Sequence, residues 1–266
     1  MAEETTIELK RAALNHYFQN LNTPQQQAVF HVNGPVLVLA GAGSGKTTAM
    51  IHRIVQMIHF GDGWVQANAS ITKEDAAYLK DYIADKQPAD LERLCSILAV
   101  QPIQPWHILA ITFTNKAANE LRSRLLQAIG EECASMLHAS TFHSACVRIL
   151  RRSISKLGYD SNFTIYDTDD SQRLMKSCIA DADVSEKQFP PRAVLTEISL
   201  AKDRMCSPEY FCIEAGSDYR KMVIGKLYKE YQNRLKSANA LDFDDLIYKT
   251  VELLESLPEE LEYYQN

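Results

Sequence analysis

Val36-Leu37-Val38-Leu39 and the nine residues that follow, Ala40-Gly41-Ala42-Gly43-Ser44-Gly45-Lys46-Thr47-Thr48, are the stretch that decides the fold of this chain. Four consecutive apolar residues predict a buried strand, and the apolar periodicity that begins at Met50 predicts a helix over residues 48–60. Glycine tolerates backbone conformations that a side chain forbids, so successive N–H groups of the turn can converge on phosphate oxygens. The dipole of the following helix adds positive potential at the same place. The stretch therefore predicts a phosphate-binding loop between a strand and a helix.

The end of this loop carries the side chains that a nucleoside triphosphate requires. The Lys46 ammonium can reach the β- and γ-phosphates, and the Thr47 hydroxyl can be a ligand of Mg²⁺, which makes these two the candidate catalytic residues. The strict pattern has glycine where Ala40 stands, but alanine is small enough to keep the turn. We therefore expect nucleotide binding by the whole loop, namely Ala40, Gly41, Ala42, Gly43, Ser44, Gly45, Lys46, Thr47 and Thr48.

Composition places the chain among ordinary globular proteins. Its 266 residues suit one large or two medium domains, and 46% apolar with 23% charged residues can support a core. The six cysteines are scattered without metal-binding spacing, which is typical of reduced thiols in a cytoplasmic protein. The N-terminus is charged and amphipathic rather than a signal peptide, and no apolar run reaches membrane-spanning length. We expect a cytoplasmic protein with no membrane partner.

Charge is distributed unevenly along the chain. The net charge is −6, but residues 241–266 hold eight acidic residues and one lysine. Residues 110–156, in contrast, hold seven lysines and arginines and three glutamates. A basic middle with an acidic tail is compatible with a local nucleic-acid groove, although it does not require one.

Capping and periodicity signals predict a mostly helical chain beyond the loop. Thr23 as N-cap, Pro24 at the first helical position and Gln26 closing a capping box predict a short helix that ends at Phe30. Glycines and prolines indicate a surface excursion over residues 61–105. The predicted strands are 107–112 and 163–166, and the predicted helices are 73–86, 90–99, 115–129, 141–157, 171–182, 190–204, 208–214, 217–237 and 243–256.

Several polar segments allow a functional and a structural interpretation. Thr112-Phe113-Thr114-Asn115 lies at the carboxyl end of the second predicted strand, where ligands bind in open α/β sheets. Phe113 could stack on a base there, or the segment could be a capped turn with Phe113 in the core. Read in isolation, Thr141-Phe142-His143 and Asp242 also favour structural roles, the latter as an N-cap. Asp167, the nearest approach to an acidic residue at a strand end, has the pattern of a helix cap.

Taken in order, these segments resemble the N-terminal part of the UvrD/Rep/PcrA family of superfamily 1 DNA helicases. LNTPQQQAV resembles the family's Q motif, AGAGSGKTT motif I, ITFTNKAANELRSRL motif Ia, TFHSACVRILRR motif Ib, and ALDFDDLI the element before motif II. The resemblance implies ATP and Mg²⁺ as cofactors, with Gln25 on the adenine and Arg53 near the nucleotide. It implies a path for single-stranded DNA along Phe113, Thr114, Asn115, Lys116, Thr141, His143 and Phe243.

The resemblance also implies the fold and the domain plan. The fold would be α/β, a RecA-like P-loop NTPase parallel sheet with an inserted, mostly helical subdomain. Residues 1–152 would form subdomain 1A with 61–105 as a surface insertion, residues 153–237 subdomain 1B, and residues 238–266 the return to 1A. The sequence stops where the acidic motif II would begin, so we expect a piece of a longer protein whose second RecA-like domain lies in the missing C-terminal half.

The implied activity is that of an ATP-dependent DNA helicase or translocase acting in repair or replication on single-stranded DNA and single-strand/double-strand junctions. The piece itself is expected to bind ATP and single-stranded DNA without hydrolysing ATP, because a Walker B carboxylate is missing. Two alternatives stay open at this point. One is the N-terminal part of a RecB- or AddA-type helicase–nuclease subunit, and the other is a small-molecule P-loop kinase.

Overall fold

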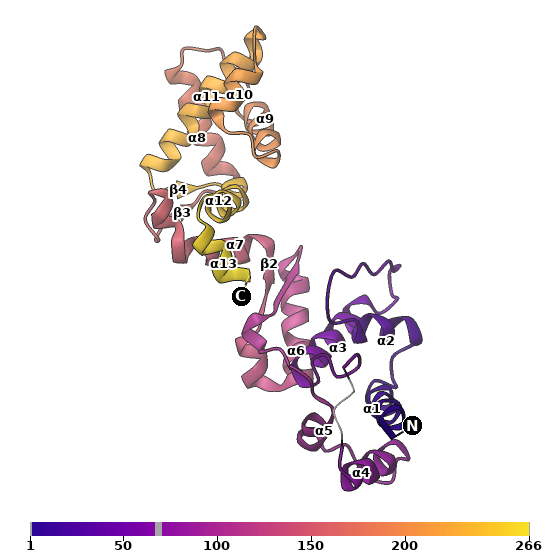
Figure 1. Cartoon of the computed structure of the whole chain (residues 1–266). Helices are drawn as coiled ribbons and strands as arrows, with labels where there is room; N and C mark the ends of the chain where they lie inside the picture. The colour runs from indigo at the N-terminus through magenta and orange to yellow at the C-terminus, as the bar shows by residue number, and fades with distance from the viewer. Residues whose placement is uncertain (1, 67–70, 266) are drawn as a thin grey trace. The chain divides into compact units, whose positions relative to one another are not determined.

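The computed structural model describes residues 2–66 and 71–265, and the chain divides into two compact units, Met1–Ser140 and Thr141–Asn266. Each unit is mostly helical, and the described residues form two two-stranded sheets, β1–β2 and β3–β4 (Figure 1). The elements up to β2, which ends at the boundary, are α1 (Ala2–Tyr17), α2 (Thr23–Phe30), α3 (Lys46–His59), α4 (Lys73–Ile83), α5 (Leu91–Leu98), η1 (Pro105–His107), β1 (Leu109–Thr112), α6 (Asn115–Met136) and β2 (His138–Thr141). Those of the C-terminal unit are α7 (Phe142–Ser153), η2 (Ile154–Leu157), β3 (Thr164–Ile165), α8 (Thr168–Asp181), α9 (Pro191–Asp203), α10 (Pro208–Glu214), α11 (Tyr219–Ser237), β4 (Ala240–Leu241), α12 (Phe243–Ser256) and α13 (Pro258–Gln265).

One apolar core unites the helices of the N-terminal unit. Leu14, Phe18 and Phe60 are almost completely buried in it, together with Leu121 and Leu125 from one face of α6. That face was predicted from the periodicity of residues 115–129, and the helix continues beyond it to Met136 through a kink at Gly130, whose φ is +78°. The kink needs glycine because a side chain is strained at that φ.

The apolar run Val36–Leu39 is not a strand, which corrects the first expectation from the sequence. Its residues belong to no sheet, and Leu37 and Leu39 are 84% and 86% exposed. A strand forms only where a neighbouring strand accepts its backbone hydrogen bonds. In the described part of the chain, β1 pairs with β2 instead, so the run before the phosphate loop has no strand to pair with.

The segment 61–105 contributes to the core of the N-terminal unit, which corrects the expectation of a surface excursion. The predicted helices are present as α4 and α5, and α4 packs against α1, beside which it lies in Figure 1. Leu79, Leu94 and Leu98 of these helices are completely buried. A contact of 3.1 Å between His16 Nε2 and Asp85 Oδ1 joins α1 to the residues that follow α4. The expectation for residues 67–70 within this segment lies outside the described residues.

The start of α2 lies one residue earlier than the sequence predicted. Asn22, not Thr23, is the N-cap, and it forms a capping box with Gln25 rather than Gln26. The observed box satisfies the N–H groups of Gln25 and Asn22, whereas a Thr23–Gln26 box would satisfy those one residue later. The shift moves Gln25 onto the helix start, where it also contacts the phosphate loop.

The C-terminal unit has two apolar clusters, one on each side of the short sheet. β3 pairs in parallel with β4, with Thr164 opposite Ala240. Helices α8, α9 and α11 enclose the first cluster, which includes the fully buried Tyr228 and Tyr231, and α7 and α12 enclose the second. The predicted helices of this region are all present, and α13 is an additional one. Among the residues described, no helix combines the length and the apolar character that crossing a bilayer requires.

Candidate nucleotide and nucleic-acid sites

The phosphate loop has the backbone of an anion-binding site. Gly43 and Gly45 both adopt positive φ, +75° and +81°, and α3 begins immediately afterwards at Lys46. No side chain caps this helix start. The first N–H groups of α3 therefore have no side-chain partner, and they add to the positive end of the helix dipole. A negatively charged group at this point satisfies both.

The Lys46 ammonium lies over the loop. Its Nζ donates to the carbonyl oxygens of Ala40 at 2.9 Å and Gly41 at 2.6 Å, and the Ser44 hydroxyl donates to the same Gly41 oxygen at 2.8 Å. Lys46 and Thr47 are both exposed in the first turn of α3. The arrangement brings a cation, a hydroxyl and uncapped N–H groups to one place, which suits the phosphate chain of a nucleotide and the Mg²⁺ bound to it.

Gln25 joins the phosphate loop to α2. Its Nε2 donates to the Ser44 carbonyl oxygen at 3.1 Å, while its Oε1 accepts from Asn22 N at 3.1 Å. The contact is close, because a Cβ added at Gly45 would lie 2.5 Å from Gln25 Nε2. Gln25 is therefore a support of the loop in this structure, a role that sequence reasoning missed. Its contact with adenine stays a prediction.

Arg53 lies at the end of α2. Its guanidinium donates to the carbonyl oxygens of Ala28 at 3.2 Å and Val32 at 3.3 Å. Partial burial lowers the pKa of Arg53 from its usual value. These contacts bind α3 to the C-terminus of α2, where carbonyl groups lack helical partners and favour a cation. A position near the nucleotide stays a prediction.

The candidate DNA-binding residues of the N-terminal unit lie between β1 and α6 and in the first turn of α6. Phe113 is 91% exposed, which excludes the interpretation that its ring belongs to the core. Thr114 caps α6 by accepting from Ala117 N at 3.1 Å, and it is followed by the exposed Asn115 and Lys116. The threonine is thus a structural cap, while the ring and the lysine face solvent.

The candidates of the C-terminal unit gather at the starts of α7 and α12. Thr141 caps α7, where its Oγ1 lies 2.9 Å from Ser144 Oγ. Two residues later, the His143 ring meets the Phe243 ring edge to face, with 5.6 Å between centroids and 75° between planes. Phe243 is half-exposed as the first residue of α12. The structure therefore brings His143 and Phe243 together, although they are 100 positions apart in the sequence.

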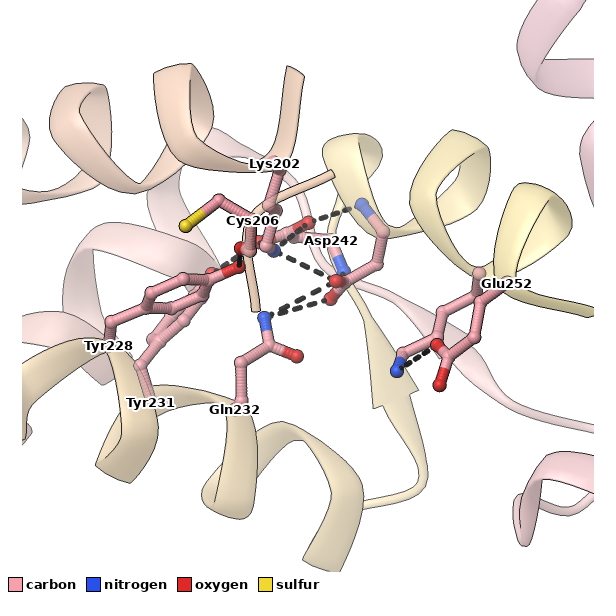
Figure 2. Close-up of polar contacts among 9 residues, drawn as sticks. Lys202, Cys206, Tyr228, Tyr231, Gln232, Asp242 and Glu252 are labelled. Carbon is pink, nitrogen blue, oxygen red and sulfur yellow. Dashed lines mark hydrogen bonds and ion pairs between the residues drawn. The ribbon is translucent and has the colours of Figure 1, made fainter. Parts of the chain in front are cut away.

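A buried ion cluster lies directly beneath the start of α12 (Figure 2). Lys202 of α9 places its Nζ 2.7 Å from Asp242 Oδ2 and 2.9 Å from Asp245 Oδ1. From α11, the Tyr231 hydroxyl donates to Asp242 at 3.0 Å, and Gln232 Nε2 donates to Asp245 at 3.3 Å. The sequence had indicated only the capping role of Asp242. Lys202 follows Val194 and Ile198 at helical spacing on the buried face of α9, a signal that sequence reasoning missed.

Burial and charge act in opposite directions on these groups. Burial raises the pKa of the Asp245 carboxyl to about 6, although the Lys202 ammonium acts to lower it. The pKa of the Asp242 carboxyl is below its usual value because Lys202 and the hydrogen bonds from Asp245 N and Tyr231 outweigh burial. Asp242 and Tyr231 also line a pocket of about 350 Å³ beside Phe243.

The remaining acidic candidate is a helix cap. Asp167 Oδ1 accepts from the N–H groups of Asp169 and Asp170 at 2.8 and 2.9 Å, as expected for the N-cap of α8. Within residues 2–66 and 71–265, no group of three histidine, cysteine or acidic side chains is arranged to hold a metal ion.

Comparison with known proteins identifies the family. The sequence model of the UvrD/REP helicase N-terminal domain matches residues 21–68 and 91–266, which is most of the chain. The chain belongs to this family. It is 39% identical over 253 residues to the ATP-dependent DNA helicase PcrA of Staphylococcus epidermidis, a match that covers 95% of the chain and 29% of that protein. The PcrA helicase of Bacillus subtilis is 39% identical over 251 residues, covering 94% of the chain and 28% of that protein.

Two features of the match bear on the site. The chain spans less than a third of the length of the curated relatives it matches, including the PcrA helicase of Staphylococcus aureus, where the covered share is 29%. The UvrD/REP family model matches on both sides of residues 69–90 and not within them. This interval contains α4, which packs on α1 away from the phosphate loop, so the loop, α3 and the starts of α6, α7 and α12 all lie in the matched segments.

Proposed function

We propose that this chain is the N-terminal ATP- and single-stranded-DNA-binding part of an ATP-dependent DNA helicase or translocase that acts in repair or replication. The observation that carries the proposal is the phosphate loop, whose left-handed glycines lead into a helix start without a side-chain cap, beneath the Lys46 ammonium. Family membership supports the proposal, because the PcrA relatives are named ATP-dependent DNA helicases.

The residues of the loop fit the phosphate chain of ATP with Mg²⁺. Lys46 would exchange its bonds to two loop carbonyls for charge-assisted bonds to the β- and γ-phosphates, which are stronger. The Thr47 hydroxyl would be a ligand of Mg²⁺, and Gln25 would hold the loop while its amide faces the adenine. Bound ATP supplies the free energy that the whole protein uses to move along DNA.

The DNA path would use exposed aromatic rings at helix starts. Phe113 in one unit and Phe243 in the other offer faces on which unstacked bases can lie. Thr114, Asn115 and Lys116, together with Thr141 and His143, would bind the sugar–phosphate chain. The partners would be single-stranded DNA and its junctions with duplex, and the protein would work in the cytoplasm together with a second RecA-like domain from the rest of its length.

The finer fold assignment is also a proposal. β1 would be a strand of a parallel RecA-like sheet in subdomain 1A, with residues 61–105 inserted and residues 238–266 returning to it. Residues 153–237 would be the helical subdomain 1B.

Nucleotide binding tests the proposal directly. We expect a fluorescent ATP analogue with Mg²⁺ to bind the purified chain, and Lys46→Ala to raise the dissociation constant roughly tenfold or more, as loss of a charged hydrogen bond predicts. Lys73→Ala is the matched control, since Lys73 is also an exposed first residue of a helix, α4. Equal weakening by the two substitutions, or no Mg²⁺-dependent binding at all, would contradict the assignment.

DNA binding provides an independent test. A labelled oligothymidine should bind at low salt and dissociate as salt rises, because lysines and arginines displace counterions from phosphates. Phe243→Ala should weaken binding by about tenfold, in the range expected for one base stacked on an aromatic ring. Tyr219→Ala is the matched control, because Tyr219 is an exposed aromatic at the first position of α11. An equal loss in both variants would remove the DNA path from α12.

The chain by itself should bind ATP without turning it over. The nearest acidic candidate, Asp167, is occupied in capping α8, and hydrolysis requires a carboxylate that holds Mg²⁺ and positions water. DNA-stimulated phosphate release by the chain, abolished by Lys46→Ala, would refute this expectation. The relatives named above are helicases, so neither the helicase–nuclease nor the kinase alternative gains support.

A further inference from the structure

The capping of α12 does not require the buried Lys202. Asp242 and Asp245 form a complete capping box, in which Asp245 N donates to Asp242 Oδ1 at 2.8 Å and Asp242 N to Asp245 Oδ2 at 3.3 Å. Lys202 comes from α9, 40 positions away, and is 3% exposed. A capping box on an exposed helix start functions without such a partner. The lysine therefore serves a purpose other than capping.

Because the cluster is buried, its charged side chains are stable only when all of them are paired. Asp245 is 1% exposed, so two carboxylates and one ammonium lie together out of water. Buried ion clusters add little stability over apolar side chains, but removing one member leaves a charge uncompensated. The start of α12 can consequently stay in this place only while α9 supplies Lys202 and α11 supplies Tyr231 and Gln232 (Figure 2).

The residue that this arrangement fixes is Phe243. It follows Asp242 directly, and its ring is half-exposed while its edge-to-face contact is with His143 of α7. A shift of the Asp242 backbone would carry the Phe243 ring with it, because a ring has only two side-chain torsions with which to compensate. The helical region thus sets the position of an aromatic ring on a different helix.

We propose that Lys202 is a positioning residue for single-stranded DNA binding, which holds Phe243 in place by anchoring the start of α12 to α9. The inference rests on the proposed function only for the identity of the ligand. The role of the helical region would be to hold the Phe243 ring in position for stacking on a base. Displacement of α9 should then weaken DNA binding although α9 does not contact DNA.

The first test needs no DNA. Lys202→Met combined with Asp245→Asn keeps the net charge of the cluster and the Asp242 cap, and removes only the link to α9. The ring proton signals of His143, assigned by comparison with His143→Gln, report whether the Phe243 ring still lies beside it. We expect this double variant to shift the His143 signals most of the way to their values in Phe243→Ala, whereas Asp245→Asn alone leaves them near wild type.

The matched control is Lys249→Met, which removes a lysine of α12 that pairs with Glu252 outside the cluster. It should leave the His143 signals unchanged. Unchanged signals in the folded double variant would overturn the proposal. If circular dichroism shows that the double variant is unfolded, Lys202→Gln combined with Asp245→Asn provides the test, because a shorter amide then replaces the ammonium and its charged bonds to Asp242 and Asp245. A partial shift in the same direction is then expected, and no shift would overturn the proposal.

The second test is a double-mutant cycle on oligothymidine binding. We expect the Lys202→Met/Asp245→Asn variant to bind about tenfold more weakly than wild type, and Phe243→Ala to add less than twofold in that background. Additive losses would show that Lys202 does not act through Phe243 and would refute the proposal. Absence of oligothymidine binding by wild type would instead count against the proposed function, while the His143 signals still decide the positioning role.

Discussion

Alanine substitutions at Gly43 and Gly45, the two left-handed glycines of the phosphate loop, measure how strongly Gln25 stabilises this loop. Replacing either Gly43 or Gly45 with alanine places a side chain at positive φ, which costs about 1–2 kcal/mol in each case. A Cβ at Gly43 meets no atom within 4 Å, whereas a Cβ at Gly45 lies 2.5 Å from Gln25 Nε2. The Gln25 amide would have to move and lose its bond to the Ser44 carbonyl, a further cost of about 1 kcal/mol.

Urea denaturation followed by tryptophan fluorescence is the appropriate measurement. Both tryptophans lie in the N-terminal unit, and the Trp64 ring stacks on Phe30 at the end of α2 with 3.9 Å between centroids. We expect Gly45→Ala to lower the free energy of unfolding by about 1 kcal/mol more than Gly43→Ala does. In a Gln25→Ala background the two substitutions should cost the same. Equal costs in the wild-type background, or a difference that survives Gln25→Ala, would refute the proposed support.

Three further predictions concern stability. Because the folded-state pKa of Asp245 is raised to about 6, the stability that its protonated form contributes is present below the unfolded-state pKa of about 4 and is lost as pH rises toward 6. Urea denaturation should show a loss of about 1–3 kcal/mol across this interval, and Asp245→Asn should abolish that loss. Arg53→Met removes two hydrogen bonds to carbonyl oxygens at the end of α2, so it should lower the free energy of unfolding of the N-terminal unit by about 1–3 kcal/mol. An unchanged denaturation curve, followed by tryptophan fluorescence, would exclude this contact in solution. Leu98→Ala should lower the free energy of unfolding by about 2–5 kcal/mol, because Leu98 is completely buried. Leu91→Ala, on the exposed side of α5, should lower it by less than about 1 kcal/mol. Similar losses for the two substitutions would show that segment 61–105 is not part of the core.

Local sequence signals predicted most of the helices. Helix starts such as those at Thr114, Thr141 and Asp242 are encoded within three residues of the cap, so the sequence contains all the groups involved. The same holds for the phosphate loop, because its glycines and lysine act on their own backbone. The predicted start of α2 was wrong by one residue for a local reason as well, since the pairs Asn22–Gln25 and Thr23–Gln26 both satisfy the capping-box pattern.

Only the tertiary structure decided the features that depend on distant partners. Four apolar residues at Val36–Leu39 indicate burial, yet a strand needs a neighbour that no local pattern supplies, and here the run is exposed. The spacing of Lys202 from Val194 and Ile198 puts it on the buried face of α9, but only the fold supplies Asp242 as its partner. The sequence by itself determined where helices begin and where the glycines turn the chain before α3, because those interactions span a few residues. Packing across 40 or more positions decided which charges and rings meet.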